Sequence, residues 1–214
     1  MNSSSSPDDP AALSYLELRA AVGGIGLVLP IVLAIVGRLF DGAWLRPSLS
    51  AYYYTHLGDY FVGSLCAIGV FLAFTRGYGG PDVIAGAVAG VCAIGVGLFP
   101  TTPLVNPTPG AEDIGVAHYV FAAVLFLTLA VMSIFLFRKT ASRENRTEQK
   151  KKRDVVYLVS GLVILACIAA IGVLHFAAPD RLGAWPYPEF WLESFAIEAF
   201  SVAWLTKGEA IWGD

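Results

Sequence analysis

Six separate stretches of about 20 mostly apolar residues are the feature that most constrains how this chain can fold. About 20 helical residues cross the roughly 30 Å hydrocarbon core of a bilayer. Apolar residues make up 56% of the 214 residues and charged residues only 14%, too few charges to cover a soluble globule of this size. The chain is therefore predicted to be an all-α, polytopic membrane protein with a six-helix bundle. The composition excludes a disordered chain, a collagen and a nucleic-acid-binding domain.

The predicted spans belong to one transmembrane domain, residues 15–214. A polar segment, residues 1–14, precedes it and is expected to be a disordered cytoplasmic tail. This segment lacks the basic start of a secretory signal, so the first apolar stretch is expected to be retained. Glycines and prolines separate most of the stretches, and a basic segment, Arg138 to Arg153, separates the fourth from the fifth. The six predicted spans are 17–40, 56–75, 81–99, 116–137, 154–177 and 188–206.

Lysine and arginine predict the orientation of the chain. Eight of the 14 basic residues lie in the short segment from Arg138 to Arg153. Because cytoplasmic loops are enriched in Lys and Arg, this loop is expected inside, and six spans then place both termini inside. The predicted location is a bacterial cytoplasmic (inner) membrane. The lipid bilayer is the expected partner, a homo-oligomer remains possible, and no nucleic acid is expected.

Small residues recur at four-residue spacing in the third stretch. Gly86 and Gly90 form one such pair, and Ala93 and Gly97 form another. This spacing lets helix backbones approach closely, so a central place in the bundle is expected for this helix. The chain has three cysteines, none of them in a C-x-x-C pair, and we interpret them as small core residues.

All three histidines fall near the predicted outer ends of the spans, at a similar depth to three carboxylates. The six residues are His56, His118, His175, Asp59, Glu189 and Glu193. They either converge on one outward-facing polar pocket for a lipid headgroup, metal or small ligand, or reach separately for water and headgroups.

In the pocket interpretation, His118 and His175 would be metal ligands, with zinc the possible metal. Glu193 or Asp59 would act as the general base of a metal-assisted hydrolase. His56 and Glu189 would contribute to ligand binding. No close histidine pair on a single helix supports the metal, because none of the three histidines lies within one or two turns of another in the sequence.

Glu198 lies near the middle of the sixth predicted span, where a charge is costly. Ser194 and Ser201 flank it at i−4 and i+3 and extend a polar stripe along one face. Glu198 is therefore either a protonated structural acid or the proton or cation site of a small transporter or channel subunit. A structural subunit of a larger membrane complex is a third possibility. Ser48 and Ser50, in the first predicted outer loop, are expected to make local turn bonds.

The order of these features resembles an uncharacterised bacterial six-helix membrane family, a domain of unknown function that is distantly similar to DRAM-like membrane proteins. The residues that carry the resemblance are Ser48-Leu49-Ser50, Leu98-Phe99-Pro100-Thr101 and His118. Thr101 and Thr102 stand where that family often has an acid. The resemblance implies the six-helix topology and no reaction. Zinc-dependent lipid hydrolases of the alkaline ceramidase and adiponectin-receptor type are an analogy only, because this chain lacks their paired histidines and one span.

Overall fold

The computed structural model describes residues 10–42, 45–75, 79–103, 105–139, 147–184 and 186–208, with side chains described from Glu17 onward. Within these ranges the fold is all-α, and no strand is present. The elements in chain order are α1 (Pro10–Asp41), η1 (Ser50–Tyr54), α2 (Gly58–Ala73), α3 (Gly80–Leu98), α4 (Pro109–Val131), η2 (Met132–Leu136), α5 (Glu148–Ala177), η3 (Pro179–Arg181) and α6 (Pro188–Lys207). Two elements, η1 and η3, are 3-10 helices, and η2 is a π-helical turn that continues α4.

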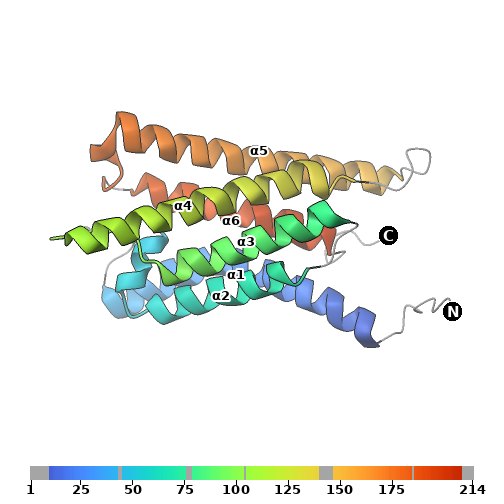
Figure 1. The fold of residues 1–214 in the computed structure, drawn as a ribbon, viewed down its shortest axis with the longest axis horizontal. Helices are drawn as coiled ribbons and strands as arrows, with labels where there is room; N and C mark the ends of the chain where they lie inside the picture. Colours follow the sequence, from blue (N-terminus) through green and yellow to red (C-terminus); the bar gives the residue numbers. More distant parts are fainter. Residues whose placement is uncertain are drawn as a thin grey trace.

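The described helices form a closed ring. Each packs against the next in sequence, and α6 packs against α1 (Figure 1). Neighbouring helices in the ring are antiparallel, so each end of the bundle holds the first residues of some helices and the last residues of the others. We call the end where α2, α4 and α6 begin the histidine end (left in Figure 1), and the opposite end, where they finish, the basic end.

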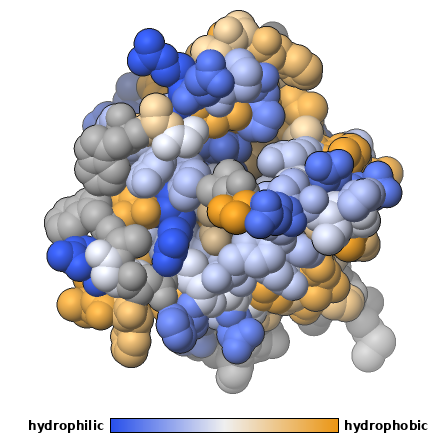
Figure 2. All heavy atoms as spheres, turned by 90° about the vertical axis from the view of Figure 1, so that its left-hand side faces the viewer, coloured by the Kyte–Doolittle hydropathy of each residue, from blue (hydrophilic) through white to orange (hydrophobic). Residues whose placement is uncertain are grey.

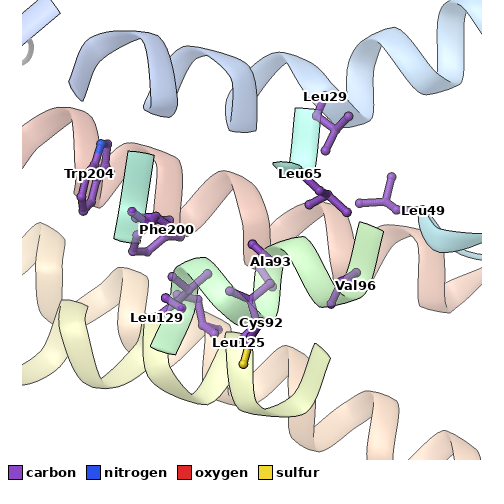
Figure 3. Packing of buried hydrophobic residues seen from close by; sticks show 14 of the residues in the cluster. Leu29, Leu49, Leu65, Cys92, Ala93, Val96, Leu125, Leu129, Phe200 and Trp204 are labelled. Carbon is purple, nitrogen blue, oxygen red and sulfur yellow. The ribbon is translucent and has the colours of Figure 1, made fainter. Parts of the chain in front are cut away.

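The core is a layer of buried aliphatic and aromatic side chains inside the ring (Figure 3). Leu29, Leu65, Ala93 and Leu125 meet there from α1, α2, α3 and α4. A small apolar cavity of about 40 Å³ remains among them. Towards the basic end, aromatic rings pack against one another in the core. The ring centroids of Phe137 and Trp204 lie 5.8 Å apart. Apolar burial therefore runs through the length of the bundle.

Glycines let α2 and α3 come into backbone contact. A Cβ added at Gly69 would lie 2.7 Å from the carbonyl oxygen of Gly90, and one added at Gly86 would lie 2.7 Å from that of Leu72. These distances are too short for a real side chain, so the close approach predicted for the third stretch is confirmed. The helix itself takes a place in the ring, beside α2 and α4, and not at its centre.

Among the described residues, four stretches of helix are long and apolar enough to cross a membrane: Glu17–Phe40, Gly80–Leu98, Pro109–Leu136 and Glu148–Ala177. Large apolar side chains are exposed on the outside of the ring, among them Ile35, Phe74, Val91, Val120, Leu162 and Phe176. Such an exterior is unfavourable in water and suits lipid, so the fold indicates a helical membrane protein.

The other two helices, α2 and α6, explain why four stretches and not the six predicted ones are long and apolar enough to cross a membrane. The α2 helix has 16 residues, which is about 24 Å at about 1.5 Å per residue and short of a bilayer core. The α6 helix is long enough, with 20 residues, but carries Glu189, Glu193 and Glu198, which lower its hydropathy. The described helices therefore support a membrane protein, whereas six spans with both termini inside remain a prediction.

Several helices begin before the predicted apolar stretches. The α4 helix begins at Pro109 instead of residue 116, because Thr108 caps it by accepting from the backbone N–H of Ala111 at 3.3 Å. Similarly, Thr147 accepts from the N–H of Lys150 at 3.1 Å and starts α5 before residue 154. The α1 helix begins at Pro10, inside the segment predicted as a tail, and residues 1–9 lie outside the described residues.

Candidate functional site

The connection between α1 and α2 folds across the histidine end and positions the start of α6. Leu49 and Tyr52 are buried and anchor this segment to the core. The hydroxyl of Ser48 accepts from the N–H of Ala51 at 3.1 Å, the local turn bond predicted for it. The carbonyl of Pro47 accepts from the N–H of Phe190 at 3.1 Å, which holds the first turn of α6 in place.

His118, which is only 2% exposed, joins three distant parts of the chain. Its Nδ1 lies 2.7 Å from the carbonyl oxygen of Phe99, and its Nε2 lies 2.9 Å from the hydroxyl of Ser50. Since a carbonyl can only accept, Nδ1 carries a hydrogen, and in the neutral imidazole Nε2 then accepts from Ser50. The prediction that Ser50 makes a local turn bond is therefore wrong. Its partner is 68 residues away.

Glu193 reaches the same hydroxyl from α6. Its Oε2 accepts from the N–H of Leu49 at 2.6 Å, and the backbone and hydroxyl of Ser50 lie close enough to stabilise the carboxylate. Ser50 therefore lies between His118 and Glu193, and its single hydroxyl proton can be given to only one of them. The three side chains form one polar unit.

Glu189 and His175 lie beside this unit, nearer to solvent. Glu189 is one helical turn before Glu193 and acts on its carboxyl group electrostatically, and the His175 imidazole acts on Glu189 in turn. The Nδ1 atom of His175 is buried and has no hydrogen-bond partner within the described residues. This atom is therefore a buried acceptor or donor that the described part of the protein leaves unused.

Tyr119 connects the two histidines. Its ring centroid lies 5.7 Å from that of His118 and 5.5 Å from that of His175, edge-on in both pairs. The Tyr119 hydroxyl accepts from the hydroxyl of Thr101 at 3.1 Å, and the carbonyl of Thr101 accepts from the hydroxyl of Tyr54 at 2.7 Å. Burial raises the pKa of Tyr54, and nearby Tyr53 and Tyr119 raise it further, so Tyr54 remains a donor at neutral pH.

Four of the predicted site residues are thus close together: His118, His175, Glu189 and Glu193. His56 and Asp59 are exposed at the start of α2. Asp59 has no contact with the cluster in the described part of the chain, and its position in the first turn of α2 suits the helix dipole. At the histidine end, hydrophilic residues cover much of the face, both in its middle and at its edge, and hydrophobic residues lie mainly at the edge (Figure 2).

Glu198 lies apart from this cluster, in the middle of α6, and is partly buried. The two serines predicted to extend its polar stripe bond to their own helix instead. Ser194 donates to the carbonyl of Phe190 at 2.7 Å, and Ser201 donates to that of Ile197 at 2.9 Å. Over the described ranges, no hydrogen bond or ion pair involves Glu198.

The residues do not fit the predicted zinc site. Nowhere in the described chain do three His, Cys, Asp or Glu side chains lie where they could hold one metal ion. Both nitrogens of His118 already face protein partners, Phe99 and Ser50, at hydrogen-bond distance. The three cysteines are separate free thiols, with Cys92 and Cys167 buried.

Sequence reasoning missed Ser50, Thr101 and Tyr119 as members of this cluster. The resemblance is the one sequence feature that pointed to this region, because its short segments around Ser50, Phe99 and His118 contact one another at the histidine end. Comparison of the chain with protein-family models, with curated protein sequences and with solved structures finds no match. The resemblance therefore stays a prediction.

Proposed function

We propose that this chain is an integral membrane protein with six spans and both termini in the cytoplasm, which binds a small positively charged group at the histidine end. Glu189, Glu193 and His175 would contact the ligand. The observation that carries the proposal is that Glu189 lies beside both Glu193 and His175, whose buried Nδ1 has no hydrogen-bond partner among the described residues. An ammonium group suits them, since it offers three hydrogen-bond donors and no acceptor.

The charge balance of the cluster favours a cation over an anion. In the described part of the chain, neither carboxylate forms an ion pair with a lysine or an arginine. The groups that act electrostatically on Glu189 and Glu193 are each other and His175. A buried carboxylate pair without a permanent cation is costly unless it is protonated or neutralised by a ligand. An amine, from a lipid headgroup or a small solute, would supply the missing charge.

A role as a serine hydrolase fits less well. Ser50 and His118 have the separation of a nucleophile and its base, and Phe99 orients the imidazole, as such catalysis requires. However, the two side chains are only 6% and 2% exposed, so a substrate carbonyl has no route to the hydroxyl. Their role in this proposal is to fix Glu193 beside Glu189.

Thermal unfolding of the purified protein tests the proposal. Ethanolamine, and separately vesicles of phosphatidylethanolamine against phosphatidylcholine, should raise the unfolding midpoint of the wild type. Glu189→Gln and Glu193→Gln should lose most of that rise. The matched control is Asp59→Asn, an acid at the same end but outside the cluster, which should keep it. A rise from ethanolamine alone identifies a soluble amine, and one from vesicles alone identifies a lipid.

The proposal fails if no amine shifts the midpoint, or if Asp59→Asn loses the shift as completely as Glu189→Gln. Stoichiometric zinc in the purified protein, lost on replacing His118 and His175 by alanine, would also overturn it in favour of a metal site. Co-purification with a stoichiometric partner chain would instead favour a structural subunit.

A second candidate function is transport of a proton or cation through Glu198. The observation that favours it is the position of this acid in mid-helix without an ion pair in the described part of the chain, an arrangement typical of ion pathways. In liposomes, Glu198→Gln should then abolish a pH-dependent flux that Glu189→Gln leaves intact.

A further inference from the structure

Positively charged side chains gather at the basic end, opposite to the proposed amine site. They come from α1, from the segment after η2, from α5 and from α6 (right in Figure 1). The residues are Arg19, Arg138, Lys150, Arg153 and Lys207. They lie where the helices leave the apolar part of the bundle, which is the level of lipid headgroups.

Two of these side chains converge on a single atom. The ammonium groups of Lys150 and Lys207 lie 3.4 Å and 3.5 Å from the carbonyl oxygen of Phe137. Phe137 directly follows the π-helical turn η2, where the last carbonyls of α4 leave the helical hydrogen-bond pattern. Lys150 also pairs with Asp154 at 2.6 Å, so it is held in place from its own helix.

The local potential at this point is positive. Burial, and after it the neighbouring charges of Lys150, Arg19 and Arg153, lower the pKa of Lys207 to about 8, with Asp82 acting in the opposite direction. Lys207 lies one residue beyond the predicted sixth span. Cations at this density are stabilised by an anion among them.

Arg138 adds hydrogen-bond donors that the described residues do not use. Its Nε is buried and has no hydrogen-bond partner there, and its Nη1 makes only a long bond, 3.4 Å, to the carbonyl of Ile134. A guanidinium presents five donors in a planar fork that matches the oxygens of a phosphate. A phosphate group would satisfy both the donors and the charge.

An apolar groove reaches the same end of the bundle. It runs between α3 and α4, has a volume of about 470 Å³, and is lined mainly by Pro81, Ile84, Val88, Leu127, Val131 and Leu136. Its end at Pro81 and Leu136 is next in sequence to Asp82 and Phe137. Lys139 reaches across this end to Asp82, with Nζ 3.0 Å from Oδ2. A groove of this kind beside a cationic cluster suits an acyl chain attached to a phosphate.

We infer that the basic end binds an anionic phospholipid of the leaflet that it faces, with the phosphate held by Arg138, Lys150 and Lys207 and an acyl chain in the groove between α3 and α4. The site is independent of the amine site at the other end. A basic loop that serves only to set the topology would not need cations that converge within the fold.

Native mass spectrometry of the full-length protein in an uncharged detergent tests this inference. The probes are phosphatidylglycerol, phosphatidylcholine and inorganic phosphate, each added alone. We expect phosphatidylglycerol to be retained at least about tenfold better than phosphatidylcholine. Arg138→Gln and Lys207→Gln should each weaken its retention about fivefold, the effect of one lipid-facing charge. Lys152→Gln removes an exposed charge from the same region and should change retention less than twofold.

Equal retention of the two lipids would overturn the inference, and so would an equal loss in Lys152→Gln. Retention of inorganic phosphate in place of lipid would show a free-anion site and would also overturn it. Lys207→Arg keeps the charge and should keep the lipid. If Lys207→Arg and Lys207→Gln lose phosphatidylglycerol alike, charge is not the cause and the site is wrong.

Discussion

At the scale of single residues, the direction in which the Ser50 hydroxyl donates depends on the protonation of Glu193. If Glu193 is protonated, it donates to Ser50, which donates to neutral His118. If Glu193 is charged, Ser50 can donate to it instead, and the Nε2 of His118 then loses its donor. Loss of the hydroxyl removes the connection in both.

Ser50→Ala should therefore destabilise the protein by about 1–3 kcal/mol, because two buried polar groups lose a partner. The matched control is Ser201→Ala. Ser201 is also buried but bonds only to the carbonyl of Ile197 in its own helix, so its loss should cost less than about 0.5 kcal/mol. Thermal unfolding in detergent measures both. Equal midpoints for the two variants would contradict the bridging role of Ser50.

Lys207 should give the stability a recognisable pH dependence. Its pKa in the folded protein is about 8, against an ordinary value of 10.5, so between these pH values the unfolded chain binds more protons. The free energy of unfolding then rises with pH in this window. Because Lys207 is partly exposed, the contribution is on the order of 1 kcal/mol between pH 7.5 and 9.5. The difference between wild type and Lys207→Met should rise by that amount. A flat or falling difference would contradict it.

The candidate site shows what residue-level reading can and cannot find. The histidines and acids near the predicted outer ends were identifiable because ionisable groups in apolar stretches are costly. Depth along a helix placed His118, His175 and Glu193 at one level, but it also placed His56 and Asp59 there, and these are exposed. Depth does not give the direction in which a side chain points. Ser50 was missed because a serine in a connecting segment has many local partners, and its distant partner leaves no local pattern in the sequence.

At the scale of the helix, apolar content predicts the buried length and capping residues set the true ends. The predicted start of α5 at residue 154 is the start of its apolar part, whereas Thr147 begins the helix with a side-chain bond. The same holds for α4, where Thr108 precedes Pro109. These signals are present in the sequence, but charged first turns obscure them when hydropathy alone is considered. The π-helical turn η2 has no signal in the sequence that we can name.

Contact between α2 and α3 makes Gly90 intolerant of even one added carbon. Its Cβ would lie 2.7 Å from the Cβ of Ala73, and Gly69 faces it across the interface. Gly90→Ala should destabilise the protein by about 1–3 kcal/mol through overpacking. Gly63→Ala, on α2 with open space around it, should be neutral or slightly stabilising because alanine favours the helix. Thermal unfolding compares the two, and an equal loss at both positions would contradict the close contact.

At the scale of the molecule, the ring of helices carries its polar cluster at one end and its cations at the other. Exposed apolar residues cover the outside between these ends. This division is what a bilayer requires, with polar groups at two interfaces and hydrocarbon between them. The length of α2 and the acids of α6 do not contradict it, because each of these helices packs against two neighbours in the ring and exposes less surface to lipid than an isolated helix does.

The orientation in the membrane can be tested directly with two cysteine variants. His56→Cys places a thiol at an exposed position of the histidine end, and Lys152→Cys places one at an exposed position near the basic end. Because basic loops face the cytoplasm, a membrane-impermeant maleimide should label His56→Cys in intact cells and Lys152→Cys only after permeabilisation. The native Cys92 and Cys167 are buried, and the unsubstituted protein gives the background from all three native thiols. The reverse labelling pattern would show that the histidine end faces the cytoplasm. The amine and phospholipid sites would then face the opposite leaflets.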